Sequence, residues 1–239
     1  MQKQTWIFDE SIHQGVNYAD NTIVQDYDAG HTQFRDFERE AIDIIDQLEL
    51  HSGHRVIDFG VGTGAFTIHA APVCQHIDAI DVSEEMLTIA KQKAQMYHLS
   101  NVTFHQGGFL TYTHQALPVD CIVTVHALHH LPDFWKMVAL QRMNRMLKPG
   151  GKLFLRDTVF PVKASEDSEI LDEWVDNIRH ASDESMADEA VIHIREEFST
   201  YNWILEGMLE KAGFVIEKQD YSNYLLATYI CVKKGGSGG

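Results

Sequence analysis

The chain has 239 residues, and its content of 44% hydrophobic and 23% charged residues is ordinary for a folded protein. A formal net charge of −16, with no clustered basic stretch, disfavours a nucleic-acid substrate because such a surface repels phosphate backbones. No apolar run approaches the roughly 18 residues that span a bilayer, and the first residues lack a secretory-signal pattern. We therefore expect a cytoplasmic protein with no membrane partner.

In chain order, residues 1–50 are predicted to form an N-terminal helical cap segment, ahead of one main domain at 51–234. The main domain begins with a buried strand, "HRVIDFG", followed by a glycine loop and a helix that starts near Gly64. A second strand, "QHIDAIDV", is expected to end at Asp81, and the next helix has Ser83 as its candidate N-cap.

The alternation continues with strands at "NVTFHQ" and "DCIVTVHA", a helix over "DFWKMVALQRMNRML" and a strand at "KLFLRDTV". Pro149 and the two glycines after it should end this helix. Strands that alternate with helices in this way predict a parallel sheet with crossover helices, which is an α/β fold.

This rhythm breaks at about 163–198, where two extra helices are predicted to form a helical lid insertion. A further helix over "STYNWILEGMLEKAGF" is expected to be capped by Ser199 or Thr200 and ended by Gly213. The last two strands, "FVIEKQDY" and "YLLATYICVKK", are too close together for a helical crossover and should form an antiparallel hairpin. Residues 235–239, "GGSGG", have the composition of a linker or tag remnant.

The glycine loop "VIDFGVGTGAF" is compatible with two cofactors. Gly60, Gly62 and Ala65 fit G-x-G-x-x-A, the fingerprint of dinucleotide-binding oxidoreductases. Asp58 argues against a dinucleotide, because a carboxylate directly before the loop would repel a pyrophosphate. The strict alternation of Gly60, Gly62 and Gly64 instead indicates a tight loop that passes beneath a bulkier, less charged ligand.

With these motifs in this order, the chain resembles the class I S-adenosylmethionine-dependent methyltransferases. The resemblance rests on "VIDFGVGTGAF", "AIDVSEEML", "ALHHLPD" and "LKPGGKLFL", and it covers roughly 56–151 and the closing hairpin. It implies a Rossmann-like, doubly wound seven-stranded sheet whose last strand is antiparallel, with S-adenosyl-L-methionine as the cofactor.

The resemblance also implies a cofactor site. The glycine loop would wrap the methionine part, Asp81 would bind both ribose hydroxyls, and Val82 and Met86 would flank the adenine. The implied cofactor-binding residues are Tyr27, Asp58, Gly60, Val61, Gly62, Thr63, Gly64, Asp81, Val82, Met86, Gly108, Phe109, Val125 and His126.

One position departs from the family pattern. Members commonly have an acidic residue where Gly108 stands in "HQGGFL", and its carboxylate accepts a hydrogen bond from the adenine amine. Gly108 has no side chain for this. Either a backbone carbonyl or water replaces the carboxylate, or cofactor affinity is reduced.

Methyl transfer is a displacement at a sulfonium carbon, so the protein mainly has to align acceptor and methyl group. A base is needed only where the acceptor begins protonated, and His126 and His130 in "VHALHHL" are the candidate catalytic residues. Capping of the next helix or packing in the loop is the alternative role. No metal is expected, because no carboxylate at ligand spacing accompanies the histidines.

Candidates on the acceptor side come from the N-terminal segment and from the lid. Tyr27 with Asp28 resembles a pair that closes over the methionine end in relatives, or it packs on the edge of the sheet. The many lid carboxylates either steer a cationic acceptor or form a solvated helix face. Further candidates are Tyr18, His31 and Arg35 for the acceptor, and Trp174, Trp203 and Tyr201 for an apolar pocket.

The leading hypothesis is therefore an S-adenosylmethionine-dependent methyltransferase acting on an O, N, S or C atom of a small-molecule acceptor. Its alternatives are a non-catalytic or regulatory S-adenosylmethionine-binding protein, a tRNA or protein methyltransferase, and an NAD-dependent oxidoreductase. A monomer or a homodimer is expected.

Overall fold

The structure, a computed structural model, describes residues 6–12, 15, 28, 31–32, 35–160, 167–223 and 225–235. One mixed sheet runs through the molecule in the order β3-β2-β1-β4-β5-β8-β7, and the short β6 pairs with β5 outside this path. The strands are β1 (Arg55–Phe59), β2 (His76–Asp81), β3 (Val102–Gln106), β4 (Val119–Val125), β5 (Leu147–Phe160), β6 (Thr200–Tyr201), β7 (Phe214–Asn223) and β8 (Leu226–Lys233).

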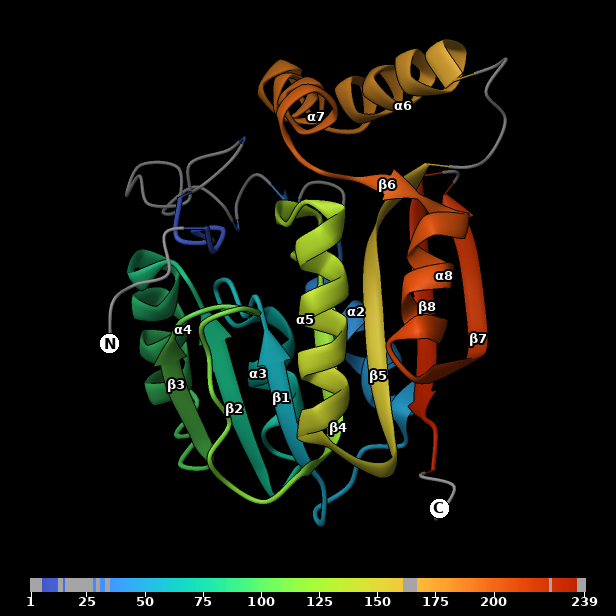
Figure 1. Cartoon of the computed structure of the whole chain (residues 1–239). Coiled ribbons are helices and arrows are strands. Elements are labelled where there is room, and N and C mark those ends of the chain that lie inside the picture. Colours follow the sequence, from blue (N-terminus) through green and yellow to red (C-terminus); the bar gives the residue numbers. More distant parts are fainter. Residues whose placement is uncertain are drawn as a thin grey trace.

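Helices cover both faces of this sheet (Figure 1). They are α2 (Phe37–Leu48), α3 (Ala65–Ala70), α4 (Glu84–Met96), α5 (Asp133–Met146), α6 (Asp167–Ala181), α7 (Glu184–Glu196) and α8 (Asn202–Lys211), with a short 3₁₀ helix, η1 (Leu128–His130). Among the described residues, no helix is both long and apolar enough to cross a membrane.

Strand directions follow the predicted pattern. The pairs β1–β2, β1–β4, β2–β3 and β4–β5 are parallel, whereas β8 is antiparallel to both β5 and β7. The doubly wound seven-strand order, the antiparallel last strand and the β7–β8 hairpin are therefore confirmed. β5 begins earlier than expected, because Leu147 already pairs with Val119 of β4 before the proline and glycines.

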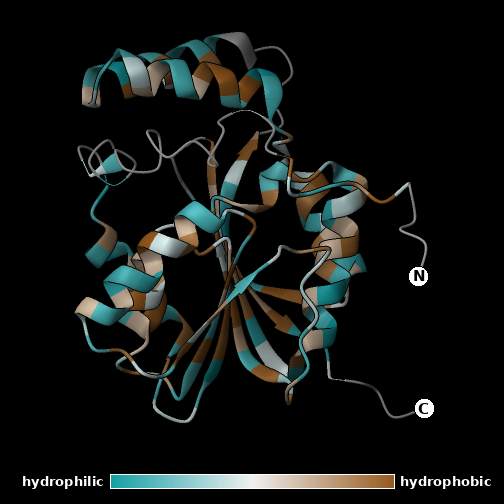
Figure 2. Cartoon of the chain, turned by 90° about the vertical axis from the view of Figure 1, so that its left-hand side faces the viewer, coloured by the Kyte–Doolittle hydropathy of each residue, from teal (hydrophilic) through white to brown (hydrophobic). Residues whose placement is uncertain are grey.

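Two hydrophobic layers explain why the central strands read as continuous apolar runs. On one face, Ile57 and Ile122 pack in a cluster with residues of α5 and α8. On the other face, Val56 and Val123 pack in a cluster with residues of α2 and α3. Both faces of the parallel strands are thus buried, and Figure 2 shows hydrophobic residues along the strands between the helices.

The two extra helices predicted within 163–198 are present as α6 and α7. They lie side by side across the end of the sheet where the parallel strands finish (Figure 1). Val175, Ala187 and Ala190 form a small core of their own between these helices, separate from the two main layers. This pair of helices is called the lid below.

The N-caps of α4 and α8 were both predicted from the sequence, and one of the two predictions is confirmed. Ser83 caps α4 as predicted, since its hydroxyl accepts a hydrogen bond from the Met86 amide at 3.1 Å. The predicted capping of α8 by Ser199 or Thr200 is wrong: the N-cap is Tyr201, and no side chain caps the helix. Thr200 belongs to β6, and its hydroxyl donates to Asp133 at 3.0 Å instead.

Candidate active site

A cavity of about 120 Å³ lies at the carboxyl ends of β1 to β4. The chain reverses its order at β1, between β2 and β4, and open α/β sheets bind ligands at such a point. Most of the predicted cofactor residues line this cavity: Gly60, Gly62, Asp81, Val82, Met86, Gly108, Phe109, Val125 and His126.

The glycine loop forms the floor of the cavity. Gly60, Gly62 and Gly64 all have positive φ angles, of 71°, 53° and 89°, which favour glycine. At Gly60 the constraint is also steric, because a Cβ there would lie 2.4 Å from the Cβ of Ala127. The loop is therefore a tight backbone cradle that leaves room for a ligand above it.

Asp81 fixes the loop from the end of β2. Its Oδ2 accepts a hydrogen bond from the Gly62 amide at 2.8 Å, and its Oδ1 accepts one from the Ser83 amide at 2.9 Å. Burial raises the pKa of Asp81, while these backbone donors oppose the rise. Each carboxylate oxygen keeps capacity for a second donor, such as a hydroxyl of a ribose.

Asp58 is buried at the end of β1 but does not line the cavity. Its Oδ2 accepts a hydrogen bond from the Thr67 hydroxyl at 2.6 Å. Burial, with Asp81 as a further cause, raises the pKa of Asp58 to about 7, although Thr67 partly opposes this. The carboxyl group of Asp58 therefore titrates close to neutral pH. It lies behind the glycine loop and not in the cavity.

Other predicted residues of the glycine loop lie outside the cavity. The hydroxyl of Thr63 donates to Asp28 at 2.7 Å, and Lys93 of α4 forms an ion pair with the same carboxylate. Val61 and Gly64 are not among the residues that line the cavity. Asp28 thus ties the loop to α4, while the neighbouring Tyr27 lies outside the described residues.

A carboxylate not identified from the sequence stands beside Gly108. A Cβ on Gly108 would lie 2.6 Å from the carboxyl carbon of Glu10, and both residues line the cavity. The sequence reading offered water, a backbone carbonyl or weaker binding as the consequence of Gly108. The structure instead places an acidic side chain there from a residue about one hundred positions earlier.

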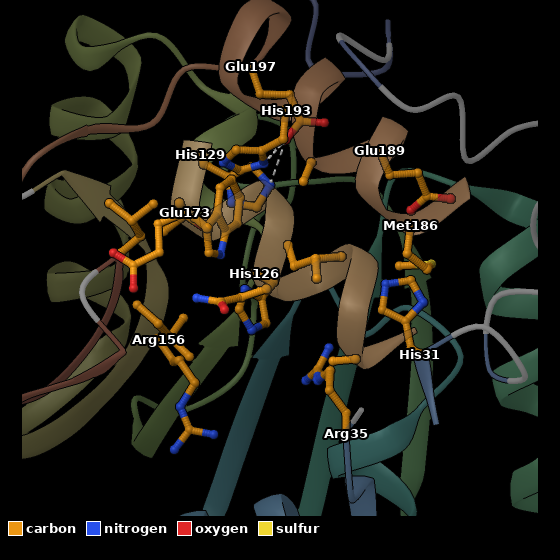
Figure 3. Close-up of a pocket in the computed structure, with 18 of the residues that line it drawn as sticks. His31, Arg35, His126, His129, Arg156, Glu173, Met186, Glu189, His193 and Glu197 are labelled. Atoms are coloured by element: carbon orange, nitrogen blue, oxygen red, sulfur yellow. Dashed lines mark ion pairs between the residues drawn. The ribbon is translucent and has the colours of Figure 1, made fainter. Parts of the chain in front are cut away.

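A second, larger cavity of about 550 Å³ lies between the sheet and the lid. Figure 3 shows Arg35, Arg156 and His126 on its sheet side and Glu173 and Glu189 on its lid side. This volume is in the range of small-molecule sites. His126 also lines the smaller cavity, so the two cavities meet at this residue.

The backbone of His126 is strained, and a hydrogen bond holds it in place. Its φ angle is 52°, and its amide donates to the Arg156 carbonyl at 2.9 Å. Burial, followed by the charge of Arg35, lowers the pKa of His126 well below its usual value. The imidazole is neutral at pH 7 and is a weak proton acceptor.

His129 lies between two carboxylates. Its Nδ1 pairs with Asp157, and its Nε2 lies 3.2 Å from Oε2 of Glu197. Burial by itself would lower the pKa of His129, but the two carboxylates outweigh burial and raise the pKa to about 10. Burial would likewise raise the pKa of Asp157, but His129 lowers it to about 2. The result is a buried imidazolium with two carboxylate partners.

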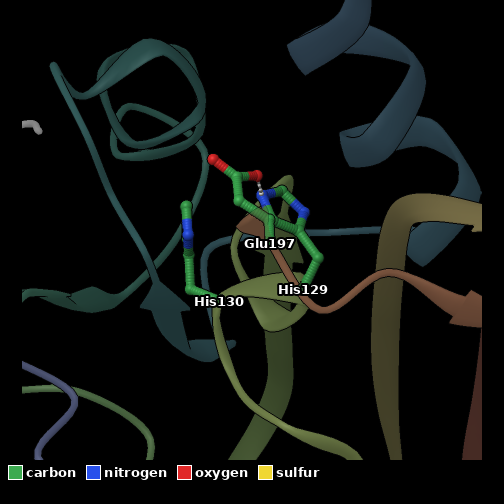
Figure 4. Close-up of side chains that lie close together, drawn as sticks. All are labelled: His129, His130 and Glu197. Atoms are coloured by element: carbon green, nitrogen blue, oxygen red, sulfur yellow. Dashed lines mark ion pairs between the residues drawn. The ribbon is translucent and has the colours of Figure 1, made fainter. Parts of the chain in front are cut away.

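His130 lies next to this network, and Figure 4 shows it beside His129 and Glu197. Burial, with the charge of His129 as a second cause, lowers the pKa of His130 to about 3. One nitrogen or oxygen from each of His129, His130 and Glu197 lies within 4.8 Å of the others. The expectation of no metal assumed that no carboxylate accompanies these histidines, whereas the fold brings Glu197 to them from the end of α7.

The acceptor-side predictions divide into three groups. His31, Arg35 and Trp174 line the larger cavity. Tyr201 instead makes an edge-to-face contact with Phe160, and Trp203 is 58% exposed on α8. Tyr18 lies outside the described residues.

The residues that sequence reasoning missed are Glu10, Asp157 and Glu197. Asp157 lies inside β5, two residues after the buried run "KLFL", and a carboxylate toward the carboxyl end of a buried parallel strand was a usable signal. Glu10 and Glu197 carry no such local signal, because each reaches its site only through the tertiary fold.

Known proteins resemble this chain in sequence. Residues 56–151 match the methyltransferase domain family. An uncharacterized methyltransferase of Bacillus mycoides is 28% identical over 210 residues, covering 87% of this chain and 88% of that protein. Another from Bacillus licheniformis is 31% identical over 145 residues, which are 61% of this chain and 64% of the length of that relative.

A solved structure shows the same fold. The magnesium protoporphyrin IX methyltransferase of Synechocystis PCC 6803, with bound SAH (S-adenosylhomocysteine), has a TM-score of 0.61 and 18% identity. The similarity covers 92% of this chain and 89% of that one. In its sheet order, its glycine loop and the match over 56–151, the chain is similar to the class I S-adenosylmethionine-dependent methyltransferases, and it has the fold of this solved methyltransferase.

Proposed function

We propose that the protein transfers a methyl group from S-adenosylmethionine to a small-molecule acceptor that binds beneath the lid. The observation that carries this proposal is the meeting of the two cavities at His126. A cofactor cradled on the glycine loop would present its methyl group toward the larger cavity, where an acceptor has room.

The residues of the smaller cavity fit this cofactor better than a dinucleotide. Among the described residues that line it, none is a lysine or an arginine, whereas Glu10 and Asp81 are carboxylates. A pyrophosphate would be repelled there, but a ribose diol is a suitable donor to Asp81. Val82, Met86 and Phe109 give an apolar wall suited to a purine. A solved neighbour of the same fold contains bound SAH, which supports the same cofactor here.

When bound, S-adenosylmethionine supplies an activated methyl group on a sulfonium. The residues of this chain then bind, orient and exclude water. Asp81 would bind the ribose, the glycine loop would support the methionine part, and His126 would mark the passage between the cavities. Proximity and alignment alone give a large share of the rate in such a displacement.

Of the candidate bases, neither is well suited to proton abstraction. The lowered pKa values of His126 and His130 make each imidazole a weak base, because efficient general bases have pKa values near the working pH. His129 is protonated at neutral pH and has no free site for a proton. We therefore propose that the histidines position the acceptor, and that the acceptor reacts as a nucleophile that needs no proton removed by a protein base.

The larger cavity indicates what kind of acceptor fits. Arg35 forms two hydrogen bonds to Glu40, at 3.0 and 2.6 Å, and Arg156 donates to the Thr228 hydroxyl at 3.0 Å. Trp174 and Ile178 add apolar surface from the lid. The acceptor we propose is a small molecule with an apolar body and at least one polar group that hydrogen-bonds to the residues on the sheet side of the larger cavity.

Titration calorimetry with SAH tests the cofactor part of the proposal. Wild-type protein is expected to bind SAH, and Asp81→Asn to weaken binding by about 10-fold, because a charged acceptor to the ribose is lost. Glu210→Gln, an exposed substitution on α8, is the matched control and should leave binding unchanged. Equal affinity of Asp81→Asn and wild type would remove Asp81 from the site.

A panel of small-molecule acceptors, with SAH release as the readout, tests the catalytic part. Turnover of a small molecule is the expected result. Binding of SAH without turnover of any panel member, combined with methylation of tRNA or protein, would contradict the small-molecule assignment.

A further inference from the structure

The carboxylate of Glu10 lies at one end of the smaller cavity. Its Oε1 accepts hydrogen bonds from the amide and the hydroxyl of Thr111, both at 2.7 Å. The Leu110 amide lies 3.0 Å from both carboxylate oxygens. Within the described part of the chain, Oε2 thus has only this shared donor, and it retains capacity to accept another.

Glu10 occupies the volume that a side chain at position 108 would need. A Cβ on Gly108 would lie 2.6 Å from both the carboxyl carbon and Oε2 of Glu10. Contacts this short do not occur between real atoms, so a side chain at position 108 would displace the Glu10 carboxylate from its present place. The glycine makes room for a carboxylate that reaches the cavity from the N-terminal segment.

The order of the strands shows which part of a bound adenosine would face Glu10. Along the sheet edge, Gly108 follows β3, Asp81 ends β2, and His126 follows β4 at the opposite end. His126 adjoins the acceptor cavity, and Asp81 lies between the two ends. With the ribose at Asp81 and the methyl group toward His126, the base lies at the β3 end, against Phe109 and next to Glu10.

We infer that Glu10 recognises the adenine by accepting a hydrogen bond from its exocyclic 6-amino group at Oε2. This inference rests on the proposed function, since it requires an adenosine in the smaller cavity. The residue selects for an amine at this position, because a 6-oxo group would face the carboxylate with a lone pair. Glu10 also caps the turn at residues 110–111 through the three donors described above.

Two ligands separate recognition of the amine from a merely structural role of Glu10. SAH has the 6-amino group and an unprotonated N1, whereas S-inosylhomocysteine has a 6-oxo group and an N1–H on the same heavy-atom skeleton. Calorimetry on the full chain gives the ratio of the two dissociation constants. We expect wild type to favour SAH by at least about 10-fold, as for a hydrogen bond to a charged group.

Variants then test the assignment to Glu10. Glu10→Gln should bring the ratio close to one, because the carboxamide can donate to the 6-oxo group. Asp9→Asn is the matched control, since Asp9 is exposed and does not line the cavity, and its ratio should equal that of wild type. Circular dichroism and the unfolding midpoint verify that each variant is folded.

Relocation of the carboxylate gives a second, independent test. Gly108→Asp alone should weaken binding of both ligands, because the new side chain displaces the Glu10 carboxylate from its present place and puts a second negative charge beside it. The double variant Glu10→Ala, Gly108→Asp removes this conflict, and it should recover preference for SAH over S-inosylhomocysteine.

The outcomes are distinguishable. If Glu10→Gln weakens both ligands equally and leaves their ratio unchanged, Glu10 only caps the turn and the inference is overturned. If wild type binds SAH but shows no preference over the 6-oxo ligand, the inference is also overturned while the proposed function stands. If wild type does not bind SAH at all, the proposed function fails and this inference fails with it.

Discussion

Asp58 is a buried carboxylate whose pKa is raised to about 7, mainly by burial. Its hydrogen bond from Thr67 only partly compensates for the lost water. A carboxyl group that is harder to ionise in the folded state than in the unfolded state costs stability wherever the unfolded chain has it ionised. This cost is absent below the unfolded pKa of about 3.8, grows as pH rises, and is complete above about 7.

Because an asparagine at position 58 cannot ionise, we expect the Asp58→Asn variant to gain stability relative to wild type as pH rises. The free energy of unfolding of the variant, minus that of wild type, should increase by about 2–4 kcal/mol between pH 4 and pH 8. Urea unfolding at both pH values measures the difference. A pH-independent difference would mean that Asp58 ionises as easily in the folded protein as in the unfolded chain.

At the scale of elements, the lid is fastened to the sheet where α7 ends. Glu197 accepts from His193 at 2.5 Å and pairs with His129, and the Phe198 amide donates to the His129 carbonyl at 2.9 Å. Lys136 of α5 contacts the Phe198 carbonyl as well. These contacts fix the direction in which the chain leaves α7 and enters β6.

We expect Glu197→Gln to loosen the lid more than the sheet. Removing one member of a buried ion pair leaves the imidazolium of His129 partly uncompensated, with a cost of about 3 kcal/mol. Hydrogen exchange should become faster in α7, whereas the amides of β1 and β4 should keep their protection. The matched control is Glu196→Gln, an exposed neighbour paired with Arg195, which should behave as wild type. Equal acceleration in both variants would contradict a fastening role for Glu197.

At the scale of the whole molecule, two cavities that share His126 are lined by residues of the sheet, of the N-terminal segment and of the lid. A ligand that binds the folded chain but not the unfolded chain stabilises the folded chain. The free energy of unfolding rises with the logarithm of the ratio of ligand concentration to dissociation constant. Stabilisation by a bound cofactor does not depend on the identity of the acceptor, so it tests the cofactor class directly.

SAH at 100 times its dissociation constant should raise the free energy of unfolding by about 2.7 kcal/mol. For a chain of this size the melting temperature should rise by about 5–10 °C, while NADH at the same concentration should leave it unchanged. Thermal unfolding followed by circular dichroism measures both. A rise with NADH and none with SAH would favour the oxidoreductase alternative and contradict the methyltransferase function.

Much of the fold was predictable because its signals are local. Strands buried on both faces appear as apolar runs, and helices begin at residues such as Ser83 that cap them. The capping of α8 was mispredicted because Thr200 pairs in β6 with β5, a contact between segments about forty residues apart. Local sequence cannot report that competition.

The same division applies to the site. The sequence by itself determined the glycine loop and Asp81, because a parallel strand places the residue after its carboxyl end at the ligand edge of the sheet. Only the tertiary structure decided that Glu10 stands beside Gly108 and that Glu197 pairs with His129. Glu10 lies 100 residues before Leu110, whose amide it binds, and Glu197 lies 68 residues after His129. Their positions therefore depend on how whole elements pack and not on any local pattern.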